Sequence, residues 1–328
     1  MAIHVVGVVG FGNISIRHRS NLKLLYPEVF IVALSASGRV PTENINDVDQ
    51  IVSNIDELIG CKPDFVLVAS PAPLHSMHAE LLIKSGIPVL IEKPVTANYA
   101  GAIQLQDIAN EYDATLAVGY CLRYLPSAIK MKELIESDFL GPIYNCFINM
   151  GQYLPSWRKS KDYQASVSAN KSLGGGVLLE LSHELDYAQW LLGSLKLESS
   201  ILRNSKELDV DVEELADLVF SNCKGTICNI HLDFLQKSPQ RMCFFIGKKG
   251  RLDWDLLLNT ISYTSPAGIE VLYSDVDWDR NDMYLNMLRD FNDLMGGKPN
   301  ECVGINQAVR SIKLVDEVKV NAVWGKVQ

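Results

Sequence analysis

The sequence lacks the features that mark zinc-binding, disulfide-stabilised and nucleic-acid-binding proteins. Its seven cysteines are an odd number and include no Cys-x-x-Cys pair, which argues against a zinc site and against a disulfide framework. From this cysteine spacing we expect no bound metal. Reduced thiols are typical of the cytosol, so we also expect a cytoplasmic location. The formal net charge of −9 argues against a basic face, so we expect binding neither to nucleic acid nor to an anionic membrane surface.

Long apolar runs are also missing. The N-terminal run Ile3–Val9 has no basic region before it and no cleavage-like site after it, so it predicts a first strand and not a signal peptide. No stretch approaches the roughly 20 apolar residues of a membrane span. The 328 residues, 48% of them hydrophobic, exceed what one core usually holds, so we expect two domains.

The first 121 residues alternate short β-branched runs with amphipathic segments of helical spacing. Such alternation predicts a Rossmann domain, a doubly wound parallel sheet with helices on both faces. The predicted strands are Val5–Val9, Phe30–Leu34, Phe65–Ala69, Val89–Ile91 and Thr115–Val118.

Residues 122–328 have a different pattern, which predicts an α+β domain with a mixed or antiparallel open sheet. Alternating strand-like stretches dominate its middle, while helical spacing marks its start and end. We expect this domain to bind substrate and to mediate oligomerisation. The predicted helices are 126–136, 177–192, 282–295 and 306–323, and the clearest predicted strands are 143–150, 215–220, 225–233 and 241–246.

A glycine-rich turn, Gly10-Phe11-Gly12-Asn13-Ile14-Ser15, follows the first predicted strand. Gly10 permits a tight turn and Gly12 lets the backbone approach a pyrophosphate, while Asn13 and Ile14 begin a helix whose N-terminus offers N–H groups and a positive dipole end. Ser15 replaces the usual third glycine. Two glycines in a turn are a weak signal alone, but their position between a strand and a helix predicts a dinucleotide site.

The second predicted strand ends without an acidic residue. An acid there usually holds the ribose 2′-hydroxyl of NAD, but the sequence continues Ser35-Ala36-Ser37-Gly38-Arg39. Ser37 and Arg39 are suited to a 2′-phosphate instead, which favours NADP modestly over NAD. The alternative is that Arg39 is an ordinary solvated arginine.

Glu92-Lys93-Pro94 follows the strand Val89–Ile91, at the sheet edge where open α/β sheets bind ligands. Together with the glycine-rich turn, this motif is part of a set that occurs in a definite order. The other members are Ser70-Pro71 with His75, Gly119-Tyr120 with Arg123-Tyr124 and Pro126, Gly174-Gly175-Gly176, His183 with Asp186 and Trp190, and Gly247 with Gly250. With these motifs the chain resembles the glucose–fructose oxidoreductase / inositol dehydrogenase / MocA (Gfo/Idh/MocA) family over essentially its full length.

The resemblance implies roles for residues of the first domain. Lys93 would lie beside the nicotinamide and the substrate, where an ammonium group stabilises negative charge on a reacting oxygen or relays a proton. Ser70, Pro71, His75 and Glu92 would line the cofactor site. Without the family context, Lys93 would read as a surface lysine at a strand end.

In this family an acid and a histidine of the second domain complete the catalytic site, usually spaced Asp-x-x-x-His. Here the histidine is His183 and the acid is Glu180, three residues earlier, while Leu179 occupies the usual acid position. We expect His183 to exchange the hydroxyl proton, because imidazole titrates near neutral pH. Glu180 is expected on the same helix face. Asp186 is expected to orient His183 or to bind substrate, with a structural role as the alternative.

The segment from Gln152 to Ser172 is polar and rich in aromatic residues. Aromatic faces stack on sugar rings, while arginine binds hydroxyls or carboxylates, so Tyr153, Trp157 and Arg158 are candidate substrate residues. Arg123 is another, since it closely follows a strand end. An interdomain or dimer contact is an equally good interpretation of this segment.

The expected activity is hydride transfer between NAD(P) and a secondary alcohol of a sugar, cyclitol, sugar acid or nucleotide-linked sugar. A redox-neutral lyase or hydrolase of the same family is one alternative, and a non-enzymatic cofactor-sensing regulator is another. Family resemblance also implies a homodimer or a tetramer, with the open sheet of the second domain covered by another subunit.

Overall fold

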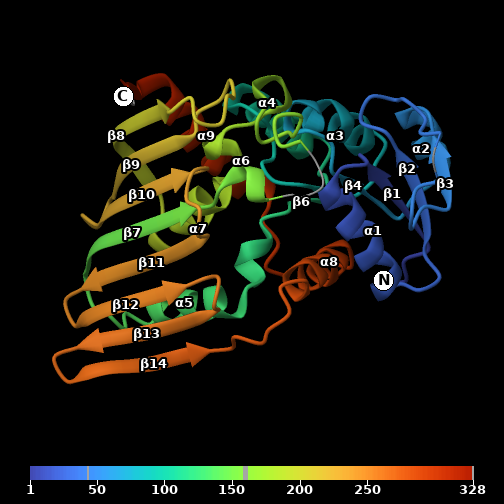
Figure 1. Cartoon of the computed structure of the whole chain (residues 1–328). Coiled ribbons are helices and arrows are strands. Elements are labelled where there is room, and N and C mark those ends of the chain that lie inside the picture. Colours follow the sequence, from blue (N-terminus) through green and yellow to red (C-terminus); the bar gives the residue numbers. More distant parts are fainter. Residues whose placement is uncertain (43, 158–161, 327–328) are drawn as a thin grey trace. The chain divides into compact units, whose positions relative to one another are not determined.

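The computed structural model describes residues 1–42, 44–157 and 162–326. It divides into two compact units (Figure 1). The first contains Met1–Cys121 together with Asn281–Ile312, and the second contains Leu122–Arg280 together with the residues after Ile312. The sequence places 281–312 in the second domain, whereas the structure packs this stretch with the N-terminal unit.

The first unit is built on a six-stranded sheet in the order β3-β2-β1-β4-β5-β6, with every paired strand parallel. The apolar runs in the sequence explain this parallel sheet, because a strand that is covered on both faces needs apolar side chains on both faces. All four residues of β4 are buried, for example. The strands are β1 Val5–Val9, β2 Phe30–Leu34, β3 Gln50–Val52, β4 Phe65–Val68, β5 Val89–Ile91 and β6 Leu116–Val118.

Helices of this unit follow the strands in the alternation that the sequence predicts. They are α1 Asn13–Leu25, α2 Ile55–Gly60, α3 His75–Lys84, α4 Tyr99–Glu111 and α8 Asp282–Met295, with the first part of α9 Ile305–Asn321. Helix α8 is strongly amphipathic and buries Phe291 against Phe65 of β4, with ring centroids 5.4 Å apart. This apolar face is the physical reason that the late helix belongs to the early sheet.

The strand order determines where a ligand can bind. β1 lies between β2 and β4, so the chain changes direction across the sheet at β1. In open α/β sheets the carboxyl ends of the strands beside such a point form the binding crevice. The loops that follow β1, β4 and β5 all leave from this edge.

The second unit is built on a nine-stranded mixed sheet in the order β14-β13-β12-β11-β7-β10-β9-β8-β15. Two pairs, β7 with β10 and β8 with β15, are parallel, and the others are antiparallel. The Rossmann sheet and this open mixed sheet confirm the predicted α/β fold class. The strands are β7 Ile143–Gly151, β8 Leu195–Asn204, β9 Leu215–Asn222, β10 Ile227–Asp233, β11 Gln240–Gly247, β12 Gly250–Asp255, β13 Thr260–Ser265, β14 Gly268–Ser274 and β15 Val323–Lys326.

Burial alternates along the central strands of this sheet. In β7, Cys146 and Ile148 are buried, whereas Asn145, Phe147 and Asn149 are only half-buried. The buried side faces helices α5 Pro126–Glu136, α6 Val177–Glu180 and α7 Ser182–Leu192, which lie along one side of the sheet (Figure 1). We call the opposite, half-buried side the open face. Its aromatic residues contact each other, since Phe147 and Phe244 stack with centroids 4.6 Å apart.

The single helix predicted over 177–192 is two helices. Helix α6 ends at Glu180, and Leu181 has φ −100° and ψ 29°, outside helical geometry, before α7 begins at Ser182. The expectation that Glu180 and His183 share one helix face is therefore wrong, because the break between them interrupts the helical repeat.

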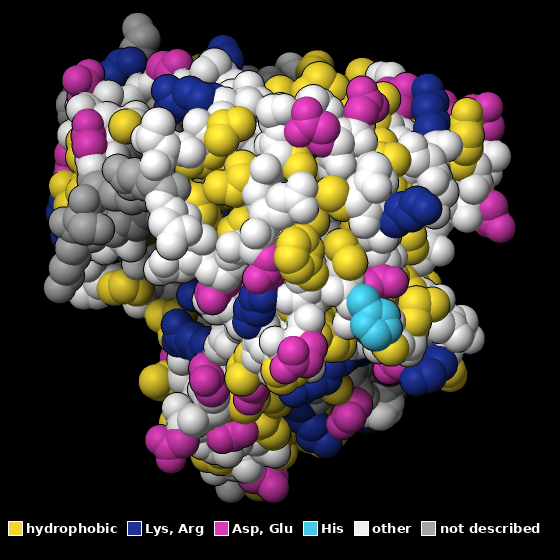
Figure 2. Space-filling model, turned by 90° about the vertical axis from the view of Figure 1, so that its right-hand side faces the viewer, with side chains coloured by type: hydrophobic (Ala, Val, Ile, Leu, Met, Phe, Trp, Pro, Cys, Tyr) yellow, Lys and Arg dark blue, Asp and Glu magenta, His cyan; other side chains and the backbone are white. Residues whose placement is uncertain are grey.

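On the face shown in Figure 2, acidic, basic and apolar side chains are interspersed. In the described part of the chain, no helix has both the length and the apolar composition that crossing a membrane requires.

Candidate functional site

The glycine-rich turn lies between β1 and α1 with a geometry that only glycine allows at one position. Gly10 has φ +115°, and a Cβ atom added there would lie 2.5 Å from the carbonyl oxygen of Ala69. The Ser15 hydroxyl donates to the Gly10 carbonyl at 2.6 Å, so the residue in the third glycine position braces the turn. The turn thus packs closely against Ala69 and is hydrogen-bonded to Ser15.

Gly12 leaves open space above the start of α1. An added Cβ atom would meet nothing within 4 Å, and Gly12 itself is exposed. Among the described residues no side chain caps this helix of 13 residues, and its first turn contains no acidic residue. An uncapped N-terminus with a positive dipole end beside open space suits a pyrophosphate, so these residues fit a dinucleotide.

Ser37 and Arg39 follow β2, and their contact with a 2′-phosphate stays a prediction. Ser37 and Arg39 are both exposed, and the Ser35 and Ser37 hydroxyls lie 3.2 Å apart. The first acid after β2 in the sequence, Glu43, lies outside the described residues. The next two contact other protein groups: Asp47 accepts from Ser20, and Asp49 accepts from the Ile31 N–H and from Lys23.

Ser70, which follows β4, and His75, which begins α3, form hydrogen bonds with neighbouring protein groups beside the expected cofactor site. The His75 ring nitrogens lie 2.6 Å from the Ser70 carbonyl oxygen and 3.0 Å from the Pro94 carbonyl oxygen. The Ser70 hydroxyl lies 3.0 Å from Nδ1 of His78. Burial lowers the pKa of His75, and burial together with His75 lowers the pKa of His78 to about 4. Direct contact of Ser70, Pro71 or His75 with a cofactor stays a prediction.

Glu92 and Lys93 follow β5 on the same sheet edge. Glu92 is 7% exposed, and its Oε1 lies 2.6 Å from Nε2 of His18 on α1. Its Oε2 accepts the backbone N–H of Lys93 at 3.1 Å. Gly119 permits this arrangement, because an added Cβ atom would lie 3.2 Å from Oε1 of Glu92. Lys93 is half-buried.

In the second unit, α7 carries a group of buried polar residues. His183 is 9% exposed, Asp186 is 2% exposed and Glu184 is fully buried. Glu180 is half-buried and lies on α6. The catalytic roles expected for His183 and Glu180 stay predictions.

Asp186 and Arg123, both expected to contact substrate, contact each other. Nε and Nη2 of Arg123 donate to the two carboxylate oxygens of Asp186 at 2.8 and 2.7 Å, a bidentate pair that is almost entirely buried. The guanidinium also lies 5.4 Å from the ring centroid of Trp190. Two groups that satisfy each other in this way fix α7 against the start of the second unit, and substrate contact by either stays a prediction.

Tyr153 and Trp157 pack beside the loop after β10. The Lys237 ammonium lies 3.2 Å from the centre of the Tyr153 ring. The indole N–H of Trp157 donates to the Gln152 carbonyl at 3.1 Å, and its ring meets Phe234 edge-on. Arg158, the third candidate of this segment, lies outside the described residues.

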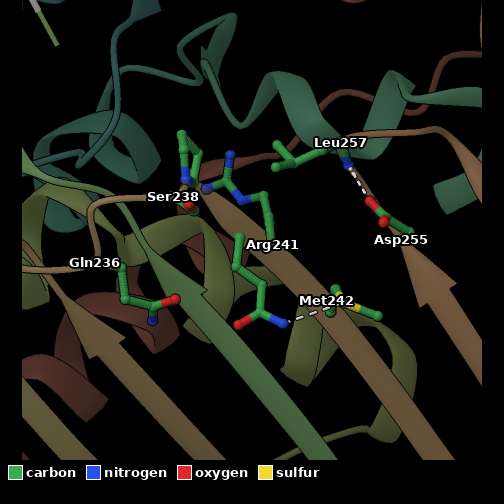
Figure 3. Close-up of a pocket in the computed structure, with 8 residues that line it drawn as sticks. Gln236, Ser238, Arg241, Met242, Asp255 and Leu257 are labelled. Carbon is green, nitrogen blue, oxygen red and sulfur yellow. Dashed lines mark hydrogen bonds between the residues drawn. The ribbon is translucent and has the colours of Figure 1, made fainter. Parts of the chain in front are cut away.

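A pocket of about 380 Å³ opens in the second unit at the start of β11 (Figure 3). Its polar lining includes Gln236, Ser238 and Arg241, and the Arg241 side chain extends toward Ser238. Nε and Nη2 of Arg241 donate to the carboxylate of Glu184 at 2.7 and 3.2 Å. The pocket is therefore joined to α7, the helix of His183, by a buried ion pair. Its lining residues are not among those that the sequence predicts to bind substrate.

Sequence reasoning missed these contacts for a common reason. His18 stands in a segment that the sequence assigns to a helix, but Glu92 is 74 positions away. Glu184 and Arg241 are 57 positions apart. A polar residue inside an apolar helix pattern is the only signal that the sequence offers, and it does not name the partner.

Comparison with known proteins places this geometry in a family. Residues 5–120 match the family model described as "Oxidoreductase family, NAD-binding Rossmann fold" of the GFO/IDH/MocA group. Residues 128–253 match the model of the GFO/IDH/MocA C-terminal domain. Together the two models cover well over half of the chain.

Individual proteins agree with these matches. The chain is 29% identical over 133 residues to the rhizopine catabolism protein MocA of Rhizobium meliloti, an alignment covering 40% of this chain and 38% of that protein. It is 28% identical over 284 residues to inositol 2-dehydrogenase 1 of Saccharopolyspora erythraea, covering 82% and 79% of the two chains. The structure of levoglucosan dehydrogenase with NADH and levoglucosan has the same fold, with a TM-score of 0.83, 15% identity and 97% of each chain covered. The chain belongs to the Gfo/Idh/MocA oxidoreductase family.

Proposed function

We propose that this protein is an NAD(P)-dependent dehydrogenase or reductase that acts on a secondary alcohol of a carbohydrate-like molecule. The proposal rests on the two segments that lie at one edge of the first sheet. The open, uncapped N-terminus of α1 at Gly12 and the motif of Lys93 follow strands β1 and β5, which end at that edge. A site for the phosphates and a cation for the reacting oxygen therefore occur together.

The bound nicotinamide supplies the hydride acceptor or donor, and the protein supplies charge and proton transfer. In the oxidative direction the substrate carbon loses a hydride and its hydroxyl loses a proton, which leaves a ketone. Lys93 would stabilise the oxygen as its negative charge develops. His183 would take the proton, because an imidazole ring nitrogen can accept a proton and return it. Glu180 is the candidate for assisting that exchange.

The relatives and the second unit both support the proposed substrate class. Inositol and levoglucosan, named for the relatives above, are a cyclitol and an anhydrosugar. The pocket beside α7 offers amide, hydroxyl and guanidinium groups, which suit hydroxyl-rich ligands. A sugar, cyclitol, sugar acid or nucleotide-linked sugar is accordingly the proposed substrate.

NADP is the proposed cofactor in preference to NAD. The residues immediately after β2 are Ser35 to Gly38 and Arg39, with no acid among them. Of the described acids that follow, Asp47 and Asp49 accept hydrogen bonds from other groups. A guanidinium and hydroxyls are suited to a 2′-phosphate, whereas an acid would repel it.

The proposed assembly is a homodimer, or a tetramer built from dimers, in the cytoplasm. Stacked aromatic side chains such as Phe147 and Phe244 on the open face support it, because apolar area on a sheet face is stabilised by cover. All seven cysteines are free thiols, as expected for a reducing compartment.

The test is a screen of NADP and NAD reduction, by absorbance of the reduced nicotinamide, with myo-inositol, levoglucosan, glucuronate and UDP-N-acetylglucosamine. Lys93→Ala and His183→Ala should each lower turnover about a hundredfold or more while cofactor affinity changes little. A redox-neutral enzyme would transform a substrate without net change in absorbance. A cofactor-sensing regulator would bind NADP and turn over none of the compounds, which would refute the enzymatic proposal.

A further inference from the structure

His18 combines complete burial with a single hydrogen-bond partner. Its side chain has no exposed surface, and Nε2 lies 2.6 Å from Oε1 of Glu92. Its Nδ1 has no partner among the described residues. Buried polar atoms are usually satisfied, so a histidine kept here with one nitrogen unsatisfied directs all of its hydrogen bonding to Glu92.

Glu92 contacts both His18 and the backbone of Lys93. One carboxylate oxygen contacts His18 and the other accepts the Lys93 N–H at 3.1 Å. Gly119 packs against the remaining side, where an added Cβ atom would lie 3.2 Å from Oε1 and 3.4 Å from Oε2 of Glu92. The carboxylate is therefore fixed on three sides, and the peptide from which the Lys93 side chain departs is fixed with it.

The same histidine stands on the helix that presents the phosphate site. α1 begins at Asn13, and His18 is about one and a half turns further along. Tyr284 of the first unit packs edge-on against the His18 ring at 5.9 Å, and Arg17 lies 4.7 Å from the centre of the Tyr284 ring. The ring of His18 has little freedom to turn away from Glu92.

A second histidine contacts Pro94, the residue that follows Lys93. His75 on α3 contacts the carbonyl oxygen of Pro94 at 3.0 Å and that of Ser70 at 2.6 Å. Lys93 thus lies between two residues that buried histidines of two different helices hold in place.

We propose that His18 is a positioning residue for Lys93: through Glu92 it links the helix that receives the cofactor phosphates to the backbone of the catalytic lysine. This inference rests on the proposed function, in which Lys93 acts on the substrate oxygen. A small displacement of such a group is costly, because misplacement by about 1 Å can lower a rate about a hundredfold. The link therefore affects turnover more than cofactor binding.

The test compares three variants of the full-length protein. His18→Phe keeps an aromatic ring against Tyr284 and removes the hydrogen bond, and His18→Gln restores a donor of similar reach. Leu22→Ala, at a fully buried position on the same helix, is the control for a weakened α1 without loss of the contact. For each variant we would measure kcat and KM with the panel compound that the wild type turns over fastest, the Kd of NADPH by fluorescence, and amide hydrogen exchange of the peptide spanning 90–97 without cofactor.

We expect His18→Phe to lower kcat at least about tenfold, to change the Kd of NADPH less than threefold and to speed exchange at Lys93. His18→Gln should recover most of the loss, and Leu22→Ala should retain kcat. A kcat of His18→Phe within twofold of the wild type would overturn the inference. So would equal losses in the Phe and Gln variants, which would indicate a purely structural histidine. A wild type without turnover for any compound would instead refute the proposed function.

Discussion

Replacing His78 by asparagine should remove part of the dependence of stability on pH. His78 is buried, and its pKa is lowered from 6.5 to about 4 by burial first and by His75 second. Below pH 6.5 the unfolded chain therefore binds a proton at this position that the folded chain does not take up until about pH 4. As the pH is lowered from 6.5 to about 4, the free energy of unfolding should decrease, by about 1.4 kcal/mol per pH unit at most and by about 3 kcal/mol in all.

Asparagine is the suitable substitution because its amide oxygen can replace Nδ1, the atom that lies 3.0 Å from the Ser70 hydroxyl. Urea unfolding would be followed by tryptophan fluorescence at pH 7, 6 and 5. Between pH 7 and pH 5 the wild type should lose about 2 kcal/mol more than His78→Asn. Burial lowers the pKa of His75 too, and the comparison cancels that contribution because both proteins contain His75. His4→Asn, which removes an exposed histidine, is the control. Parallel pH profiles of wild type and His78→Asn would refute the reasoning.

Three further changes test other parts of the structure. Arg39→Ala should weaken NADPH binding about tenfold and leave NADH binding unchanged; an equal loss for both cofactors would remove the argument for a 2′-phosphate site. If the open face forms the proposed subunit contact, Phe147→Glu should reduce the mass measured by light scattering at micromolar concentration, since a buried unpaired charge would oppose that contact, and an unchanged mass would contradict the proposed interface. Gly119→Ala should lower kcat several-fold through displacement of Glu92 with little effect on NADPH affinity, whereas wild-type kcat would show that the carboxylate can yield.

The first sheet could be predicted closely because its signal is local. Strands β1, β2 and β5 begin and end where the sequence predicts, since a strand buried on both faces must be apolar throughout. The edge strands of the second sheet are different. β14 exposes Ile269 and Val271, and β15 ends the sheet at its opposite edge beside β8. An edge strand is held by backbone hydrogen bonds, which leave no pattern in the side chains.

The site was predictable as a set of segments and not as a set of contacts. Gly12 and Lys93 follow strands whose ends the topology brings to one edge, so the pattern of strands and helices locates them. Arg123 and Asp186 were each interpretable as a substrate residue, yet they satisfy one another across 63 positions. Which opposite charges pair depends on tertiary packing, about which spacing in the sequence carries no information.

The buried pair of Glu184 and Arg241 has a consequence for how this protein can evolve. Loss of Arg241 would remove this ion pair from the fully buried Glu184 carboxylate, and breaking a buried pair in this way typically costs about 3–5 kcal/mol, a large share of the stability of an ordinary domain. Replacement of both by apolar residues of similar volume is often neutral. A substitution at position 241, in the wall of the pocket, should therefore be tolerated best together with a substitution at position 184.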